Sequence, residues 1–525
     1  MATSVRPRIA VIGGGWAGLA AASRLTDRLA PPDSSSSEAT AEIHLFEAAP
    51  AIGGRAKGLF WQHPNEPALR APIDNGQHLI LGAHRHTLDW LARLGVLQTQ
   101  WQNTPMIWRD RQAGQQLQLG NGPLWQLALA QFWLRAKSRA QRQHLGLIWP
   151  IDLMRLLAAV RSARSQRTQP PDQRADQSTA SLAQSLRLSE AFYQRFYGPL
   201  VEAILNTPVD QASAITFLNV LSDVLDPKAA MSRCWHPSTH LGQDALDPWQ
   251  TWLTDRGVRL HCGQRISRIE PTGLQALAHQ AHQAHQAPRS HRWRLHSTGA
   301  PTEPDLLEQA FDAVLVCLAP WHAKDLLDQS RQAFQPDAPA VEQLNQCLQR
   351  EPLAIATAWL WLPTSATDRA LSWSGLHPHA VYPLSLPTSQ QAVRAIGLFR
   401  PAGPWGRLAS LSFSALRQPD RAQLEREAHD LFLTWLGPWA QDHPRRLLIE
   451  KQATWSCDVE SQAWGASFAA DLRAGPQAAD GLSAGLWIAS DAHQPGLPAT
   501  IESAVLAGER AADQAIDALT STDKR

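Results

Sequence analysis

A strand, a glycine-rich turn and a helix follow one another near the N-terminus, and they constrain the chain more than any other feature. The run IAVI at 9–12 is apolar and β-branched, as a buried parallel strand should be. Gly13, Gly15 and Gly18 follow in GxGxxG spacing and lead into an Ala/Leu-rich helix. The first glycine permits the tight turn, the second lets the backbone approach a pyrophosphate, and the third lets helix and strand pack closely. The segment therefore predicts a dinucleotide-binding α/β unit.

Two further elements extend the expected contacts with the dinucleotide. The next predicted strand ends at Glu47, where a carboxylate can accept hydrogen bonds from ribose hydroxyls. Gly53, Gly54 and Arg55 come soon after and combine close backbone approach with a fixed cation for a diphosphate. Because FAD binds in an extended form and needs contacts beyond the first turn, this addition favours FAD over NAD.

The C-terminal part of the chain contains a second unit of this kind. Residues 486–490 read as a strand, and a long helix follows after a turn. Asp491 at the strand end can accept hydrogen bonds from a ribityl or diphosphate-side group. Pro498, Ala499 and Thr500 stand near the helix start, and the amides around Leu497–Thr500 would point the positive helix end at the N1/O2 edge of a flavin. The alternative is that these residues form only the last αβ unit of a Rossmann-type domain.

Composition narrows the class of protein. A chain of 525 residues exceeds what one hydrophobic core usually supports, and a net charge of +1 gives no indication of a nucleic-acid partner. The five cysteines contain no CxxC pair, which argues against a zinc site or a disulfide framework and suits a reducing cytosol. His279, His282 and His285 could hold a metal, but a flexible low-complexity loop is the preferred interpretation, so no metal is expected. The sequence contains no uncharged apolar stretch of about 18 residues, so a transmembrane helix is not expected.

The motifs together resemble those of the flavin-containing amine oxidase and phytoene desaturase superfamily. Within it, the stretches IDNGQHLILGAHRHTLDWLARLG, GPLVEAILNTPVDQASAITFLNVL and PGLPATIESAV are similar to the hydroxysqualene dehydroxylases, the squalene-associated FAD-dependent desaturases. The resemblance runs from about residue 8 to about residue 515. One departure is Ser490, which stands where a glycine is expected before Asp491.

The resemblance implies an activity in squalene and hopanoid biosynthesis. The expected reaction is reductive removal of the hydroxyl of hydroxysqualene to give squalene, with FAD kept reduced by an external electron donor. The resemblance also places Ile266 near the adenine through its backbone, and places the polar segment 74–78 between the isoalloxazine ring and the substrate.

The polar segment supplies the candidate catalytic residues. Loss of an allylic hydroxide requires protonation of the leaving oxygen, and the resulting cation can then take hydride from the flavin. We therefore expect His78 or Asp74 to be the general acid, with Asn75 and Gln77 orienting the hydroxyl or the flavin. The alternative is that Asp74 and Asn75 cap a turn and His78 is a satisfied core histidine. In the turn before the last helix, His493 is a second candidate acid.

Residues 119–167 predict a membrane contact. Trp-rich apolar runs are followed by basic residues, and the stretch from Arg135 to Arg167 contains eight Lys or Arg but one acid, Asp152. Basic amphipathic segments of this kind are typical of monotopic contacts, through which a polyprene could enter from lipid. The expected location is therefore cytoplasmic and peripheral, on the inner face of the cell membrane. The alternative is a helical cap whose arginines are merely solvated.

The expected fold class is α/β, with a discontinuous Rossmann-type FAD-binding domain, an α+β substrate domain and a helical membrane-facing cap. The predicted boundaries are 1–110, 226–325 and 446–520 for the FAD-binding parts, 111–225 for the cap and 326–445 for the substrate-domain sheet. Two alternative functions stay open. One is a carotenoid-type desaturase or amine oxidase acting on another substrate, and the other is a non-catalytic prenyl-lipid binding protein.

Overall fold

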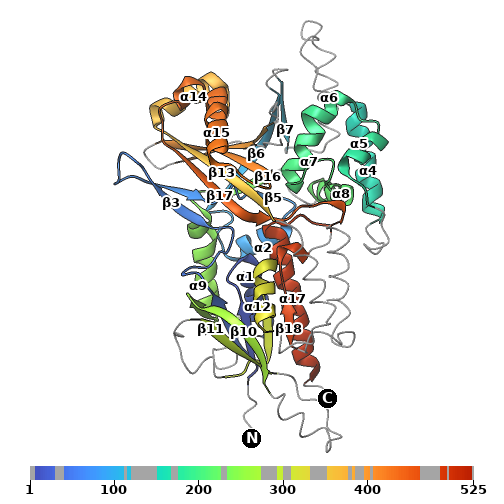
Figure 1. Ribbon diagram of the computed structural model, residues 1–525, viewed down its shortest axis with the longest axis vertical. Coiled ribbons are helices and arrows are strands. Elements are labelled where there is room, and N and C mark those ends of the chain that lie inside the picture. Colours follow the sequence, from blue (N-terminus) through green and yellow to red (C-terminus); the bar gives the residue numbers. More distant parts are fainter. Residues whose placement is uncertain are drawn as a thin grey trace, which may run out of the picture.

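The chain forms two bodies joined along the long axis of the molecule (Figure 1). The computed structural model describes residues 6–29, 41–110, 115–119, 150–166, 176–225, 233–272, 292–298, 309–330, 352–376, 381–384, 395–401, 406–460, 485–493 and 496–522. The predicted histidine loop (His279, His282, His285) and residues 120–149 of the expected membrane segment lie outside these residues.

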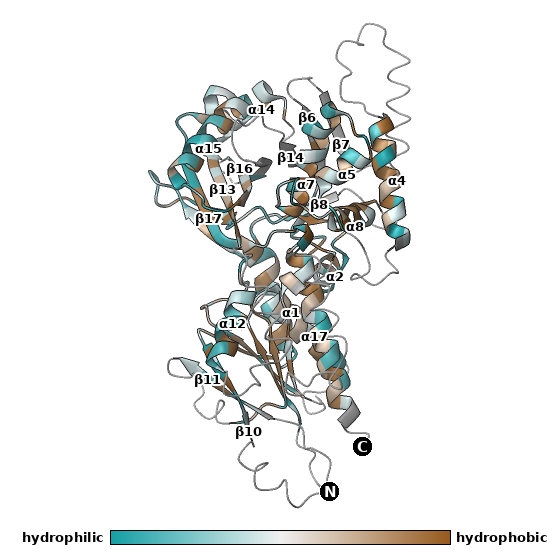
Figure 2. Ribbon diagram, turned by 45° about the vertical axis from the view of Figure 1, so that its right-hand side comes forward, coloured by the Kyte–Doolittle hydropathy of each residue, from teal (hydrophilic) through white to brown (hydrophobic). Residues whose placement is uncertain are grey.

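A parallel sheet, with five strands in the described part of the chain, forms the lower body in Figure 1. Its strands, in spatial order, are β18 (Leu486–Ile488), β12 (Ala313–Val316), β1 (Arg8–Ile12), β2 (Glu42–Glu47) and β9 (Arg259–Cys262). All four residues of β12 are buried, and Figure 2 shows the strands of this sheet as largely hydrophobic. Such runs are expected where helices cover both faces of a parallel sheet. This confirms a Rossmann-type domain assembled from distant parts of the chain.

Two helices from opposite ends of the chain lie side by side on this sheet (Figure 1). They are α1 (Trp16–Leu29) and α17 (Ile501–Thr522). A Cβ atom at Gly508 would lie 2.0 Å from the carbonyl oxygen of Ala17, so only glycine permits this approach. Helix α12 (Pro320–Gln329) also belongs to this body. The close approach brings the C-terminal strand and turn to the nucleotide end of the fold.

Among the residues that the structure describes, nine strands form the sheet of the second body. Its path is β17 (Arg445–Thr454), β13 (Leu353–Leu362), β16 (Arg407–Leu416), β15 (Ala395–Pro401), β14 (Val381–Leu384), β6 (Trp101–Asp110), β8 (Arg233–Pro237) and β5 (Ile80–Leu81), with β7 (Gln115–Leu119) paired to β6. Helices α14 (Thr364–Ser374) and α15 (Arg421–Leu436) cover one face, where alternate residues such as Ala356, Ala358 and Leu360 join their core. The opposite face packs in part against the segment 58–74 and in part lines the site described below.

The second body contains segments from ranges that the predicted boundaries assign to the FAD-binding domain. Strands β5 and β6 lie within 1–110, and β8 lies within 226–325, yet all three join the nine-stranded sheet. The ranges predicted for the FAD-binding domain therefore also build the second body. Strand patterns in the sequence identify a strand but not the sheet it joins, because pairing partners are chosen by tertiary contacts.

The remaining described elements are short sheets and helices. They are the hairpins β3 (Gly58–Gln62) with β4 (Arg70–Asp74) and β10 (Arg265–Thr272) with β11 (Arg292–Thr298), and the helices α2 (Arg85–Arg93), α4 (Pro150–Gln166), α5 (Thr179–Ser185), α6 (Glu190–Phe192), η3 (Tyr193–Tyr197), α7 (Gly198–Leu205), α8 (Ala214–Val224), η4 (Gly242–Leu246), α9 (Asp247–Asp255), η6 (Gly437–Ala440) and η7 (Asp491–His493). Among the segments that the structure describes, none of the helices combines the length and apolar character needed to span a bilayer.

A buried histidine pair in the parallel sheet predicts that acid destabilises the fold. His44 Nδ1 lies 3.2 Å from His261 Nε2, and His44 is fully buried. Burial, with a smaller effect of the Arg8 charge, lowers the pKa of His44 to about 3. A histidine in the unfolded chain has a pKa of about 6.5, so the unfolded state binds more protons below that pH. The free energy of unfolding should therefore fall by roughly 1.4 kcal/mol per pH unit between about 6.5 and 3.

This prediction is checked by urea unfolding of the protein and of His44→Phe at pH 7.5 and pH 5. The wild-type chain should lose about 2 kcal/mol more between the two pH values than the variant does. Phenylalanine keeps the aromatic packing against Phe46 and Phe311 but cannot titrate. Equal losses in both proteins would show that His44 does not carry the acid sensitivity.

Candidate active site

A cavity of about 1050 Å³ extends from the carboxyl ends of the parallel strands to the open face of the nine-stranded sheet. Ligands of open α/β sheets bind at this edge. The nucleotide end is lined by Gly13, Gly15, Glu47, Gly54, Arg55, Ile266, Cys317, Asp491, Pro498, Ala499 and Thr500, and the other end by Asn75, Gln77, His78, Leu200, Ile204, Val220, Ile355, Ser412 and Ser414. The structure thus brings the predicted cofactor residues except Gly18, and the predicted catalytic residues Asn75, Gln77 and His78, to one cavity.

The three glycines of the first turn serve different purposes. Gly13 has a φ of +108°, and a Cβ there would lie 2.4 Å from the Cys317 carbonyl oxygen. A Cβ at Gly18 would lie 1.8 Å from the carbonyl oxygen of Gly13, so the fold itself excludes a side chain at this position, which does not line the cavity. At Gly15, by contrast, a Cβ would meet only Gly54 Cα, at 3.8 Å. The protein alone does not require glycine at 15, which fits close approach by a dinucleotide.

Glu47 is held by the backbone at the end of β2. Its Oε2 accepts a hydrogen bond from Gly14 N (2.7 Å), and its Oε1 accepts one from Ala49 N (2.7 Å). These bonds fix the carboxylate at the cavity wall while leaving lone pairs for further donors. Ile266, at the start of β10, lines the same cavity. Both residues therefore occupy positions from which ribose and adenine contacts are available.

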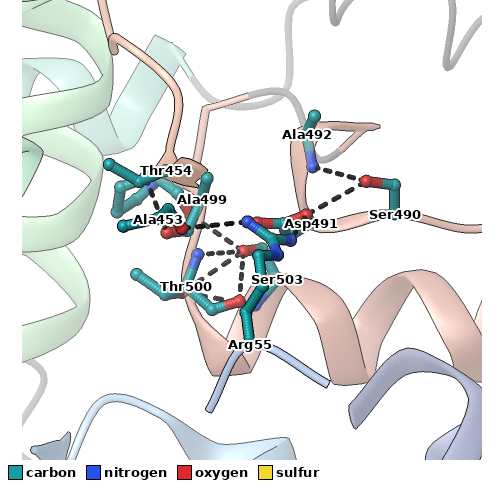
Figure 3. A network of polar contacts seen from close by, with 10 residues as sticks. Arg55, Ala453, Thr454, Ser490, Asp491, Ala492, Ala499, Thr500 and Ser503 are labelled. Carbon is teal, nitrogen blue, oxygen red and sulfur yellow. Dashed lines mark hydrogen bonds and ion pairs between the residues drawn. The ribbon is translucent and has the colours of Figure 1, made fainter. Parts of the chain in front are cut away.

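Arg55 and Asp491, predicted separately as cofactor-binding residues, contact each other (Figure 3). Arg55 Nη2 lies 2.5 Å from Asp491 Oδ1, and Nη1 donates to the Ala453 carbonyl oxygen at 2.9 Å. Ser490, which departs from the family pattern, donates to Asp491 Oδ1 at 3.0 Å and so adds to the network. The guanidinium is thus fixed at the cavity wall, where a diphosphate is expected.

The start of α17 is capped at the cavity wall. Thr500 N donates to Ser503 Oγ (2.7 Å), and Ser503 N donates to Thr500 Oγ1 (3.3 Å), which is the reciprocal arrangement of a capping box (Figure 3). Pro498, Ala499 and Thr500 line the cavity immediately before this helix. The positive end of the helix therefore lies at the cavity wall, and its contact with a flavin edge stays a prediction.

Asn75 and His78 form a hydrogen-bonded pair whose donor and acceptor roles are determined. Asn75 Nδ2 donates to the Arg55 carbonyl oxygen (2.7 Å), and its Oδ1 accepts from Lys57 N (3.1 Å). The amide orientation is therefore set, and His78 Nε2, 3.0 Å from Asn75 Oδ1, must be the donor. Nδ1 is then the His78 nitrogen left to exchange a proton with a ligand in the cavity.

The surroundings of His78 favour its neutral form. Burial is the largest cause and lowers the pKa of His78 below its ordinary value, while the negative charge of Asp74 raises it and the charge of Arg400 lowers it. A histidine held through one nitrogen and open through the other is suited to general acid–base chemistry. The structure thus places His78 at the cavity, and its role as the general acid stays a prediction.

Asp74 lies in different surroundings from those expected, whereas Gln77 lies at the cavity as predicted. Asp74 is fully buried and does not line the cavity: its Oδ2 lies 2.6 Å from Arg400 Nη1, and its Oδ1 accepts from Leu241 N at 2.7 Å. Such a carboxylate does not contact a ligand in the cavity, so direct proton donation by Asp74 does not fit this geometry. Gln77 lines the cavity, and its Nε2 donates to Ser410 Oγ at 2.7 Å. The His493 side chain lies outside the described residues.

Two contributions to the site were not predicted from the sequence. Arg400 was assigned no role, because a lone arginine shows no local sign of its partner. The stretch LNTP at 205–208 was singled out only as part of the family resemblance. In the structure, Asn206 Oδ1 accepts from Ala415 N (2.6 Å) and Thr207 Oγ1 accepts from Cys457 N (2.7 Å). These bonds fasten the helical wall of the cavity to the ends of β16 and β17.

The fold and the cavity define a dinucleotide-binding oxidoreductase of the Rossmann type. The chain belongs to the flavin containing amine oxidoreductase family, whose model matches residues 16–516. The protein is therefore an FAD-dependent oxidoreductase, as predicted.

Two curated relatives are similar over nearly their whole length. "Hydroxysqualene dehydroxylase" of Zymomonas mobilis is 23% identical over 96% of this chain and 98% of its own, and that of Rhodopseudomonas palustris is 23% identical over 96% and 97%. Among solved structures, cyclohexylamine oxidase of Brevibacterium oxydans (TM-score 0.62, 16% identity, 98% and 100% coverage) has a similar fold. So has a putative protoporphyrinogen oxidase of Exiguobacterium (0.61, 13%, 98% and 99%).

Proposed function

We propose that this oxidoreductase reductively removes the hydroxyl of hydroxysqualene, or of a similar polyprenyl alcohol, to give squalene. The relatives named hydroxysqualene dehydroxylase support this substrate class. The observation that carries the proposal is the His78–Asn75 pair, which stands in the same cavity as the cofactor-binding glycines. That pair provides a proton-exchanging nitrogen where an alcohol must lose its oxygen.

In the proposed reaction His78, Asn75 and the apolar wall of the cavity have separate roles. His78, protonated on Nδ1, gives its proton to the hydroxyl oxygen, which leaves as water, and Asn75 Oδ1 keeps the ring oriented through Nε2. When bound and reduced, FAD supplies the two electrons and the hydrogen that replace the hydroxyl. Apolar residues of the wall, such as Leu200, Ile204 and Val220, would surround the polyprene and exclude bulk water. Because each turnover consumes a reduced flavin, an external electron donor is required.

The proposal is tested by incubating the purified yellow protein, reduced with dithionite without oxygen, with hydroxysqualene. Squalene should accumulate, one equivalent per bound flavin in the absence of further reductant, and the oxidised protein should form none. If the reduced flavoprotein leaves hydroxysqualene unchanged but the oxidised form desaturates a carotenoid precursor or oxidises an amine, the alternative enzyme class is correct. If the protein binds the polyprene without taking up flavin, it is a carrier.

We further propose that helix α4 contacts the inner face of the cell membrane. Ile151 and Met154 are 62% and 68% exposed, which is unusual for large apolar side chains on a soluble surface. Arg155, Arg161 and Arg164 are exposed on the same helix. Its one acid, Asp152, is buried and accepts from Ser189 Oγ at 2.6 Å. The exposed surface of α4 is therefore apolar and basic, as binding to anionic lipid requires.

Replacing Ile151 and Met154 together with aspartate should weaken binding to phosphatidylglycerol-containing vesicles by at least about tenfold. Inserting two such side chains into lipid contributes more than the roughly 1.4 kcal/mol that a tenfold change represents. Sedimentation with vesicles measures the effect. Phe60→Asp, at an exposed apolar residue (56%) on the β3–β4 hairpin, is the matched control and should bind as the wild type does. Equal binding by all three proteins would show that α4 does not contact the membrane.

A further inference from the structure

A buried ion pair lies at the start of the segment that carries the candidate proton donor. Asp74 is the last residue of β4 and Arg400 belongs to β15, and their side chains are 0% and 1% exposed. Arg400 Nη1 lies 2.6 Å from Asp74 Oδ2, and the guanidinium also lies over the Trp359 ring, 5.6 Å from its centroid. The pair therefore joins the β3–β4 hairpin to the open face of the nine-stranded sheet.

The pair holds the start of the segment that carries Asn75 and His78. Asp74 Oδ1 accepts from Leu241 N, so both carboxylate oxygens are engaged. Arg400 Nε and Nη2 have no hydrogen-bond partner within the part of the chain that the structure describes, so Asp74 is the one anion this guanidinium contacts there. A fixed anion and a fixed cation are thus buried together at the start of this segment, and the charges of both act on His78.

We propose that Asp74 and Arg400 are positioning residues that set how readily His78 carries the transferable proton. The inference rests on the proposed function and deepens it. The charge of Asp74 stabilises the imidazolium and the charge of Arg400 opposes it, and these are the two described charged groups that act on His78. In a buried site neither charge is screened well by water. Asp74, whose effect is the larger of the two, thus offsets part of the cost of charging a buried histidine, and Arg400 limits that offset.

Three variants separate this role from a merely structural one. Asp74→Asn should lower the pKa of His78, Arg400→Gln should raise it, and the double variant, which removes both charges, should fall between them. Glutamine at 400 can still donate a hydrogen bond to Asp74. A residue that only holds the fold has no reason to shift the titration in opposite directions in the two single variants.

The titration is followed by NMR of ¹⁵N-histidine-labelled holoprotein, with His78→Gln identifying the resonance, and so does not depend on turnover. In parallel, single-turnover squalene formation is measured across pH. At pH 7.5 the rate should fall about tenfold in Asp74→Asn for each unit by which the pKa drops. Flavin content and the absorption spectrum show whether each variant is folded. If a single variant does not fold, the double variant, which leaves no unpaired charge, is compared with Arg400→Lys, which keeps the charge.

Opposite shifts in the single variants support the proposal. Shifts in the same direction, or an unchanged His78 titration in the double variant and in both single variants, overturn it. Should the titration shift as expected while the wild-type protein forms no squalene, the proposed function fails and the electrostatic coupling stands. Should squalene form without any dependence on the pair, the coupling fails and the function stands.

Discussion

Protein carrying Gly15→Ala is expected to fold but to bind flavin at least about tenfold more weakly than the wild type, a loss of roughly 1.4 kcal/mol or more. Within the protein, a Cβ at 15 meets only an ordinary contact at 3.8 Å. Its methyl group instead projects into the cavity, where the dinucleotide backbone is expected to pass. The ratio of flavin to protein absorbance after purification measures the loss, and circular dichroism and thermal unfolding of the flavin-free protein report the fold.

Gly18→Ala should behave differently and serves as the comparison. Its methyl group would lie 1.8 Å from the Gly13 carbonyl oxygen, so strand β1 and helix α1 cannot keep their packing. We expect a destabilisation of more than about 4 kcal/mol, which lies beyond the usual range for point variants. The protein should then be insoluble or unfolded with or without flavin. If Gly15→Ala retains full flavin content, the cavity beside that residue does not hold the dinucleotide as inferred.

His78→Gln is expected to lower the rate of hydroxyl removal by about 10²–10⁴-fold, the usual contribution of a general acid. Glutamine can still donate to Asn75 Oδ1, so the segment should keep its structure, but it cannot give up a proton. The active form of the wild-type protein is the protonated imidazole, whose pKa is lowered by burial. The wild-type rate should therefore rise as pH falls from 8 towards and below 6.5, and this dependence should vanish in the variant.

Single-turnover formation of squalene from reduced protein measures this effect. His63→Gln, in the loop after β3, is a matched control because His63 does not line the cavity, and it should retain the wild-type rate and pH profile. Flavin content must be equal in all three proteins. A His78→Gln protein with the full rate and an unchanged pH profile would show that His78 is not the proton donor. His493 would then be the next candidate acid to replace.

Much of the nucleotide end could be predicted from sequence because its chemistry is local. The bend at Gly13 and the approach at Gly15 depend on residues a few positions apart. Glu47, Arg55, Asp491 and the start of α17 each follow a recognisable strand or turn. The second body was harder to predict. Strands β5, β6 and β8 show ordinary strand patterns, and nothing in those patterns states which sheet they join.

The sequence by itself determined that the chain binds a dinucleotide through its two ends, because glycine spacing, strand ends and helix starts are properties of short segments. It also drew attention to the polar residues at 74–78. Only the tertiary structure decided what each of them does: it buried Asp74 against Arg400, 326 positions away, and left His78 at the cavity with one nitrogen held by Asn75. Burial and charge pairing arise when distant strands meet, and no local pattern encodes them.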